Sequence, residues 1–197
     1  MLRKLMMCVC MLLCVPADAA EWLTDIPTAQ QRAAEEGKKV LVVFTGTDWC
    51  LWCIHLKNQI FTTPAFREFA KEQLVPVEID IPRNRALVGG EENYKKNREA
   101  CRQYGITGYP TVVVMTPDGD VLGGYSGGYE NWEHARRPIE GALARAEELA
   151  AIRRQSGAAL LRSLEEFYDS LPERVKPCAR RMREEIERLR AECTAGK

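Results

Sequence analysis

Residues 40–53 read Val-Leu-Val-Val-Phe-Thr-Gly-Thr-Asp-Trp-Cys-Leu-Trp-Cys, and this stretch decides the fold. Its first five residues are continuous, apolar and mostly β-branched, which predicts a buried strand. Residues 45–48 have the composition of a turn, and the apolar residues after Cys53 recur at roughly helical spacing. The two cysteines therefore stand at a strand-to-helix junction, with Cys50 at the helix N-terminus and Cys53 one turn later.

This position has a chemical consequence for Cys50. The unpaired N–H groups and the positive end of the helix dipole favour a thiolate there. A thiol with a pKa of about 8.5 is only roughly 3% ionised at pH 7, whereas one with a pKa near 7 is about half ionised. Cys53 is close enough to form a disulfide with Cys50. The spacing predicts a redox couple, although alone it also fits half of a zinc site or a structural disulfide.

A second motif lies at residues 104–111, which read Tyr-Gly-Ile-Thr-Gly-Tyr-Pro-Thr and precede a predicted strand. Pro110 is unexpected at a strand, because proline lacks the N–H that a ladder needs, and a cis bond would explain it. With both motifs in this order, residues 22–154 resemble the thioredoxin family. The resemblance is strongest to its secreted members, which carry a Trp-Cys-x-Trp-Cys signature.

The resemblance implies a thiol–disulfide oxidoreductase with no cofactor and no metal. Cys50 would attack a substrate disulfide, and Cys53 would resolve the mixed disulfide. The substrate-binding residues would be the aromatic residues beside the cysteines and those of the proline loop, namely Trp49, Trp52, Tyr109 and Pro110. The expected partners are protein thiols and disulfides, together with a membrane or envelope redox protein that resets the couple.

Two features depart from the thioredoxin pattern. Thioredoxins carry a buried acid on the strand before the motif, and Val43 takes its place here. Deprotonation of Cys53 would then use water, the substrate or another group. Residues 51–52 are Leu-Trp rather than Gly-Pro, and this dipeptide tunes the reduction potential. The sequence therefore leaves open whether the protein acts as a reductase, an oxidase or an isomerase.

Two other classes of function remain open at this point. Soft thiolates bind Cu(I), so Cys50 and Cys53 also fit a copper-binding module. The third possibility is a redox-silent thioredoxin-fold module that binds a partner through its C-terminal helices. The chain carries 28 Lys and Arg residues and 28 Asp and Glu residues. This balance gives no indication of nucleic-acid binding.

Residues 1–19 are predicted to be a secretory signal peptide. Arg3 and Lys4 supply the charge, residues 5–15 the apolar core, and residues 17–19 a small-residue cleavage site before Ala20. We expect export to the periplasm or secretion. Five of the eight cysteines would then remain, an odd number.

Residues 20–154 are predicted to form the thioredoxin-like domain, an α/β domain with a mixed central sheet flanked by helices. The pattern predicts the order α-β-α-β-α-β-β-α. The expected helices cover residues 27–36, about 53–61, 64–72 and 91–103, with a long last helix at 131–154. The expected strands cover residues 40–44, 75–81, 112–115 and 121–125.

Residues 155–197 are predicted to be a helical C-terminal extension with one apolar stripe. Pro172 and Pro177 exclude a single straight helix, and the capping box of Ser170 with Glu173 predicts a new helix near Leu171. We expect a helical hairpin or kinked helix that packs on the domain, with a homodimer seam as the alternative.

The last two cysteines of the extension are not expected to pair with each other. Cys178 and Cys193 would stand about 22 Å apart on a continuous helix, whereas a disulfide needs Cα atoms within about 7 Å.

Overall fold

The computed structural model describes residues 21–195. The predicted signal peptide at residues 1–19 lies outside the described residues. A four-stranded mixed sheet with the order β2-β1-β3-β4 forms the centre. Its strands are β1 (Lys39–Thr45), β2 (Leu74–Asp80), β3 (Thr111–Met115) and β4 (Val121–Ser126). β1 runs parallel to β2 and antiparallel to β3, and β4 runs antiparallel to β3.

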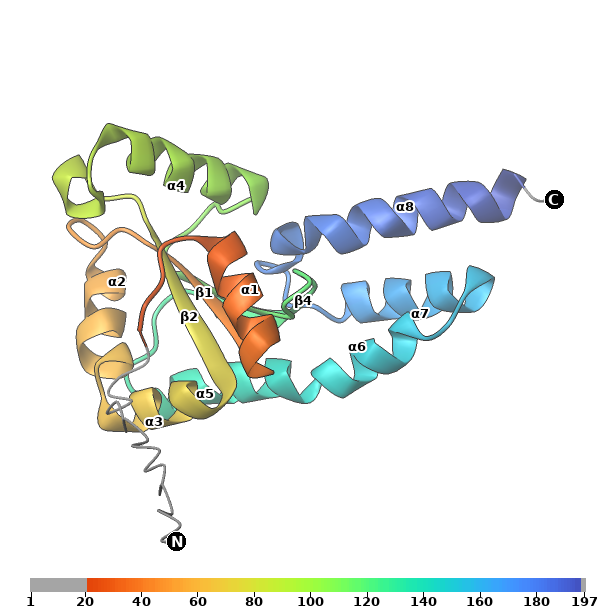
Figure 1. The fold of residues 1–197 in the computed structure, drawn as a ribbon, viewed down its shortest axis with the longest axis horizontal. Coiled ribbons are helices and arrows are strands. Elements are labelled where there is room, and N and C mark those ends of the chain that lie inside the picture. The colour runs from red at the N-terminus through yellow and green to blue at the C-terminus, as the bar shows by residue number, and fades with distance from the viewer. Residues whose placement is uncertain (1–20, 196–197) are drawn as a thin grey trace, which may run out of the picture.

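The central strand β1 is buried at every residue after Lys39. Successive side chains of a strand point to opposite faces, so continuous burial means that both faces of the sheet are covered. Helices provide this cover (Figure 1). They are α1 (Ile26–Glu36), α2 (Leu51–Leu56) with its π-helical continuation η1 (Lys57–Phe61), α3 (Pro64–Gln73), the short 3₁₀ turn η2 (Arg85–Val88), α4 (Glu91–Gln103) and α5 (Trp132–Ala144).

Three of these helices begin at the side-chain caps that their sequences provide. Asp25, Thr63 and Asn131 each accept a hydrogen bond from the N–H three residues further on. Such caps satisfy one of the free N–H groups at a helix start. The observed elements confirm the predicted α/β class and the order α-β-α-β-α-β-β-α.

The single helix predicted over residues 131–154 is wrong. The chain forms α5 and α6 (Ala146–Arg153), which meet at Arg145. The Arg145 guanidinium donates hydrogen bonds to the carbonyls of Leu122 and Phe167, each at 3.2 Å, and lies 3.9 Å from the centre of the Phe167 ring. These contacts join β4 to the C-terminal helices, and helical periodicity gives no sign of them.

The extension forms the predicted helical hairpin, but its second arm begins later than expected. α7 (Gly157–Asp169) is followed by a 3₁₀ turn, η3 (Lys176–Ala179), and by α8 (Arg180–Ala195). The helix start predicted near Leu171 is wrong, because Ser170 ends α7 and its hydroxyl donates to the Phe167 carbonyl at 2.7 Å. α7 packs against α8. The apolar stripe is buried within one chain, which favours intramolecular packing over a homodimer seam.

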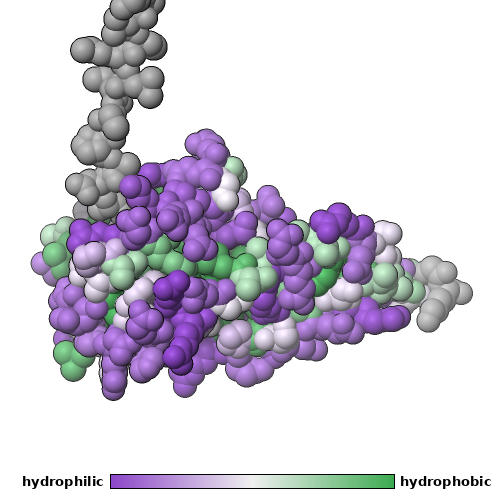
Figure 2. All heavy atoms as spheres, turned by 90° about the horizontal axis from the view of Figure 1, so that it is seen from below, coloured by the Kyte–Doolittle hydropathy of each residue, from purple (hydrophilic) through white to green (hydrophobic). Residues whose placement is uncertain are grey.

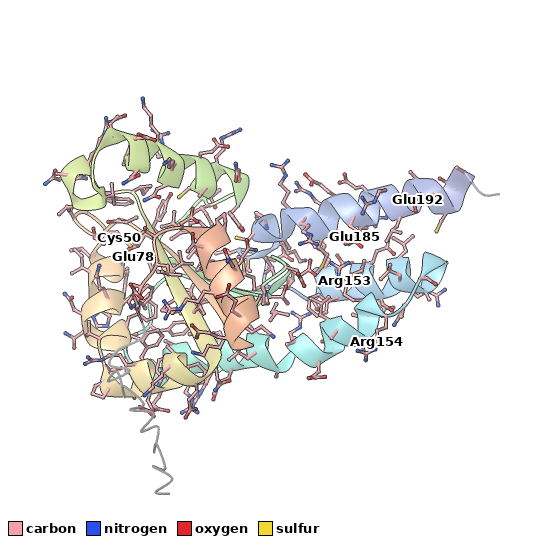
Figure 3. All side chains as sticks on the ribbon, viewed as in Figure 1. Cys50, Glu78, Arg153, Arg154, Glu185 and Glu192 are labelled. Atoms are coloured by element: carbon pink, nitrogen blue, oxygen red, sulfur yellow. A yellow bond between two sulfur atoms is a disulfide. The ribbon has the colours of Figure 1, made fainter. Side chains whose placement is uncertain are left out.

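A shared arginine joins the extension to the sheet. Arg153 at the end of α6 donates to both carboxylate oxygens of Asp120, at 3.0 and 2.8 Å, and to Glu185 of α8 at 2.6 Å. Figure 3 shows Arg153 directed toward Glu185 between α6 and α8. The Asp120 side chain is only 7% exposed, so Arg153 replaces the water that would otherwise bind this carboxylate.

The described surface is mostly hydrophilic. On the face drawn in Figure 2, polar side chains predominate and apolar ones form small patches between them. The large apolar side chains that are exposed among residues 21–195 are Leu51, Trp52 and Leu87. Within the described part of the chain, no helix has the length and apolar character to span a membrane.

Replacing Arg153 should therefore destabilise the fold. We expect Arg153→Met to lower the free energy of unfolding by about 1–3 kcal/mol, because the buried Asp120 carboxylate loses its donors. The matched control is Arg154→Met, since Arg154 is exposed and has no ion pair within residues 21–195. Urea unfolding monitored by circular dichroism measures both variants. Equal stability of the two variants would contradict the role given to Arg153.

Candidate functional site

Cys50 and Cys53 form a disulfide at the junction of β1 and α2. Their Cα atoms are 5.2 Å apart. Cys50 is the residue immediately before α2, and its sulfur accepts a hydrogen bond from the Cys53 N–H at 3.3 Å. This N–H would also stabilise a negative charge on the sulfur once the disulfide is reduced. The predicted location of the pair, at a strand-to-helix junction, is confirmed.

Two carboxylates hold the turn that carries the cysteines. Asp80, buried at the end of β2, accepts from the backbone N–H and the hydroxyl of Thr47 at 3.0 and 2.6 Å. Asp48 accepts from the N–H groups of Asn84 and Arg83, both at 2.8 Å, and these hydrogen bonds lower the pKa of Asp48. Sequence reasoning read residues 45–48 only as a turn and missed this anchoring, which depends on residues more than thirty positions away.

The two tryptophans of the motif occupy different environments. Trp49 is half-buried against Gly46, where a Cβ would lie 2.3 Å from its ring, and its Nε1–H donates to the Ile81 carbonyl at 2.9 Å. Trp52 is 52% exposed and lies against Gly128, leaving its outer surface open to solvent. Of the two tryptophans, Trp52 is thus the one whose ring is exposed on the surface.

The second motif is brought to the first through aromatic contact. The Tyr109 ring lies edge-on to Trp49, with centroids 5.5 Å apart. The Tyr109–Pro110 bond is cis, as the sequence predicted. The Pro110 carbonyl accepts from the Gly127 N–H at 2.8 Å, which fixes the loop to the end of β4. The structure therefore gathers Trp49 and Tyr109 into one contact beside the cysteine pair.

A buried valine occupies the position at which thioredoxins carry their buried acid. Val43 is 3% exposed in the centre of the sheet. Its neighbour across the β1–β2 ladder is Glu78, which binds the Lys57 ammonium through both carboxylate oxygens at 3.1 Å. Figure 3 labels Glu78 on β2.

The other described cysteines are free. Cys101 and Cys178 are buried, and Cys193 is half-buried near the end of α8, so the prediction that Cys178 and Cys193 do not pair is confirmed. Burial raises the pKa of Cys101 and raises that of Cys178 to about 12. The neighbouring Tyr109 hydroxyl opposes this rise in the pKa of Cys101, but burial is the larger effect. Within residues 21–195, no group of three or more His, Cys, Asp and Glu side chains is arranged to hold a metal.

A family model for a thioredoxin-like domain matches residues 26–136, which are more than half of the chain. The chain belongs to the thioredoxin-like family. The predicted thioredoxin fold with C-terminal helices is thereby confirmed. The fold is similar to a solved structure described as DsbH oxidoreductase, with a TM-score of 0.55 and 30% sequence identity. The superposition covers 64% of this chain and 85% of that one.

Two curated proteins of Chlamydia pneumoniae are also similar. The disulfide bond reductase DsbH is 36% identical over 94 residues, which are 48% of this chain and 55% of that protein. The thioredoxin-related protein DsbJ is 25% identical over 101 residues, which are 51% of this chain and 28% of that protein. The similarity thus spans about half of the first relative's length and less of the second. The family match ends at residue 136, before α6 and the extension.

The site predicts an order of cysteine reactivity. In reduced protein purified without residues 1–19, iodoacetamide at pH 7 should label Cys50 about ten times faster than Cys101 or Cys178, whose raised pKa values keep them protonated. Half-buried Cys193 serves as the internal reference and should also react more slowly than Cys50. Peptide mapping by mass spectrometry gives each rate, and faster labelling of Cys53 would reverse the two assigned roles.

Proposed function

We propose that this chain is an extracytoplasmic thiol–disulfide oxidoreductase that exchanges disulfides with protein substrates through Cys50 and Cys53. The observation that carries the proposal is the disulfide at the start of α2, with its sulfur hydrogen-bonded to the Cys53 N–H. Exposed Leu51 and Trp52 lie between the two cysteines, where an apolar segment of a polypeptide can dock.

The cysteines have distinct roles in the proposed reaction. The Cys50 thiolate attacks one sulfur of a substrate disulfide, so that a mixed disulfide forms and the other substrate sulfur leaves as a thiolate. Cys53, deprotonated to a thiolate, then attacks the Cys50 sulfur. This second step releases the first substrate sulfur and leaves the Cys50–Cys53 disulfide, with two electrons transferred to the substrate. Cys50 is 8% exposed and Cys53 3% exposed, which supports Cys50 as the attacking residue.

The substrate-binding residues in this proposal are Trp49, Trp52, Tyr109 and Pro110. Exposed Trp52 contacts the substrate directly, whereas Trp49 and Tyr109 support the loop that carries Pro110. The 36% identical relative is a disulfide bond reductase, which favours the reducing direction for this chain as well. A membrane or envelope thiol protein would then return the oxidised pair to the dithiol.

The proposed location follows from the sequence of residues 1–19. We assign these residues to a signal peptide, residues 20–154 to the thioredoxin-like domain and residues 155–197 to the helical extension. A cell fractionation experiment with an antibody against the protein tests the location. Retention in the cytoplasm with residues 1–19 intact would contradict it.

A redox titration tests the activity itself. Equilibration in glutathione buffers of varied ratio, followed by acid quenching and counting of alkylated thiols, should reveal one reversible two-electron transition at Cys50 and Cys53. A Cys101→Ala variant is the control and should keep the transition. Absence of the transition would reject the oxidoreductase, and protection of the two thiols that requires added Cu(I) would instead indicate the copper-binding module.

Removal of the resolving cysteine should trap substrates. In Cys53→Ala, the mixed disulfide on Cys50 cannot be resolved within the protein, so covalent adducts accumulate. Non-reducing electrophoresis of envelope extracts should show bands that disappear with dithiothreitol. The control is Cys50→Ala/Cys53→Ala, which has no attacking sulfur. Identical band patterns in the two variants would contradict the exchange mechanism.

A further inference from the structure

The segment between the two arms of the extension contacts the loop that ends at Pro110. We call residues 170–179 the connector and residues 104–110 the proline loop. The contact is closest at Gly105, where a Cβ atom would lie 2.8 Å from the Pro177 Cβ. Gly105 also has φ +62°, a left-handed conformation. Residue 105 is therefore glycine for two reasons, its backbone conformation and the Pro177 ring packed against it.

A second side chain of the connector lies near the loop, closer to Pro110. A Cβ at Gly108 would lie 3.8 Å from the Arg174 Nη1 atom, so the guanidinium is near the backbone two residues before Pro110. The Gly108 carbonyl accepts from the Thr111 hydroxyl at 2.8 Å. The middle of the proline loop is thus fixed to the start of β3, with the exposed Arg174 side chain next to it.

The first residue of the proline loop, Tyr104, lies against the strand that leads to the cysteines. Partial burial raises the pKa of its hydroxyl. The Tyr104 ring packs on Phe44 of β1 with centroids 5.5 Å apart. The connector therefore packs on the beginning of the proline loop at Gly105, and its Arg174 guanidinium lies near Gly108.

We propose that the connector is a positioning element for the proline loop, and that Arg174 and Pro177 set how well the site accepts polypeptide disulfides. The proposal rests on the proposed function. Exchange at Cys50 needs only the sulfur and a small disulfide. A polypeptide substrate must in addition lie along the loop that carries Tyr109 and Pro110. If the loop loses its support, we expect polypeptide substrates to bind more weakly, whereas the rate of exchange with small disulfides stays the same.

The experiment compares two double variants, each of which replaces one proline and one arginine by alanine. Arg174→Ala/Pro177→Ala removes the two connector side chains that lie next to Gly105 and Gly108. Pro172→Ala/Arg183→Ala is the matched control, because it removes an exposed proline of the connector and an exposed arginine of α8, neither of which is in contact with the glycines of the proline loop. Each variant is assayed with insulin, a polypeptide disulfide, and with hydroxyethyl disulfide, a small one. Hydrogen exchange of the peptide covering residues 104–110 is measured without substrate.

For Arg174→Ala/Pro177→Ala we expect the KM for insulin to rise about five- to ten-fold, with kcat and the rate with hydroxyethyl disulfide changed less than about two-fold. Amide exchange of residues 104–110 should become faster, and the control should match the wild type in every measurement. Equal losses with both substrates, or no change in KM and exchange, would overturn the proposal.

Two further results distinguish a failure of the proposed function from a failure of the positioning role. If the wild type exchanges neither substrate, the proposed function is rejected, while amide exchange still reports on the positioning role. If the double variant does not fold, Arg174→Ala alone decides, because this exposed side chain can be removed without opening the core. Its KM for insulin should rise about two- to three-fold, and a KM equal to that of Arg183→Ala would overturn the role of Arg174.

Discussion

The hydrogen bond from the Cys53 N–H to the Cys50 sulfur is the interaction around which the site is arranged. It requires Cys50 to stand immediately before α2, with a helical turn following it. The same geometry places both sulfurs within bonding distance. One backbone conformation therefore stabilises the Cys50 thiolate in the reduced protein and allows the disulfide in the oxidised protein. What the protein must supply is a turn that does not move.

Most of the polar contacts near the cysteines serve that turn. Asp80 holds Thr47 from β2, and Asp48 holds the chain at Arg83 and Asn84. Both carboxylates accept from backbone N–H groups, and hydrogen bonds to an ionised acceptor are stronger than neutral ones. The loop after β2 and the cysteine turn are thereby fixed to each other, although they are far apart in the sequence.

The sequence predicted those parts of the structure that leave a local pattern. The run at residues 40–44 predicted β1, because a strand covered on both faces has to be apolar throughout. The order of the two motifs indicated the family and with it the site. The bend at Arg145 was not predicted, since its cause is a set of hydrogen bonds to residues more than twenty positions away. Ser170 was misread for a different, local reason: its hydroxyl donates to the Phe167 carbonyl three residues earlier and ends α7, where the capping pattern predicted the start of a helix.

The extension is attached to the part of the domain that carries the proline loop. Arg153 binds Asp120 just before β4, Arg145 binds the Leu122 carbonyl within β4, and the connector packs on Gly105. These contacts lie at β4 and at the loop before β3, and Pro110 is the residue immediately before β3. In Figure 1, α8 runs from the sheet toward the C-terminus on the side away from α2. Arg145 and Arg153 precede the extension, and each contacts both the hairpin region and a C-terminal helix. The domain itself therefore supplies the side chains that hold the extension beside the strands that follow Pro110.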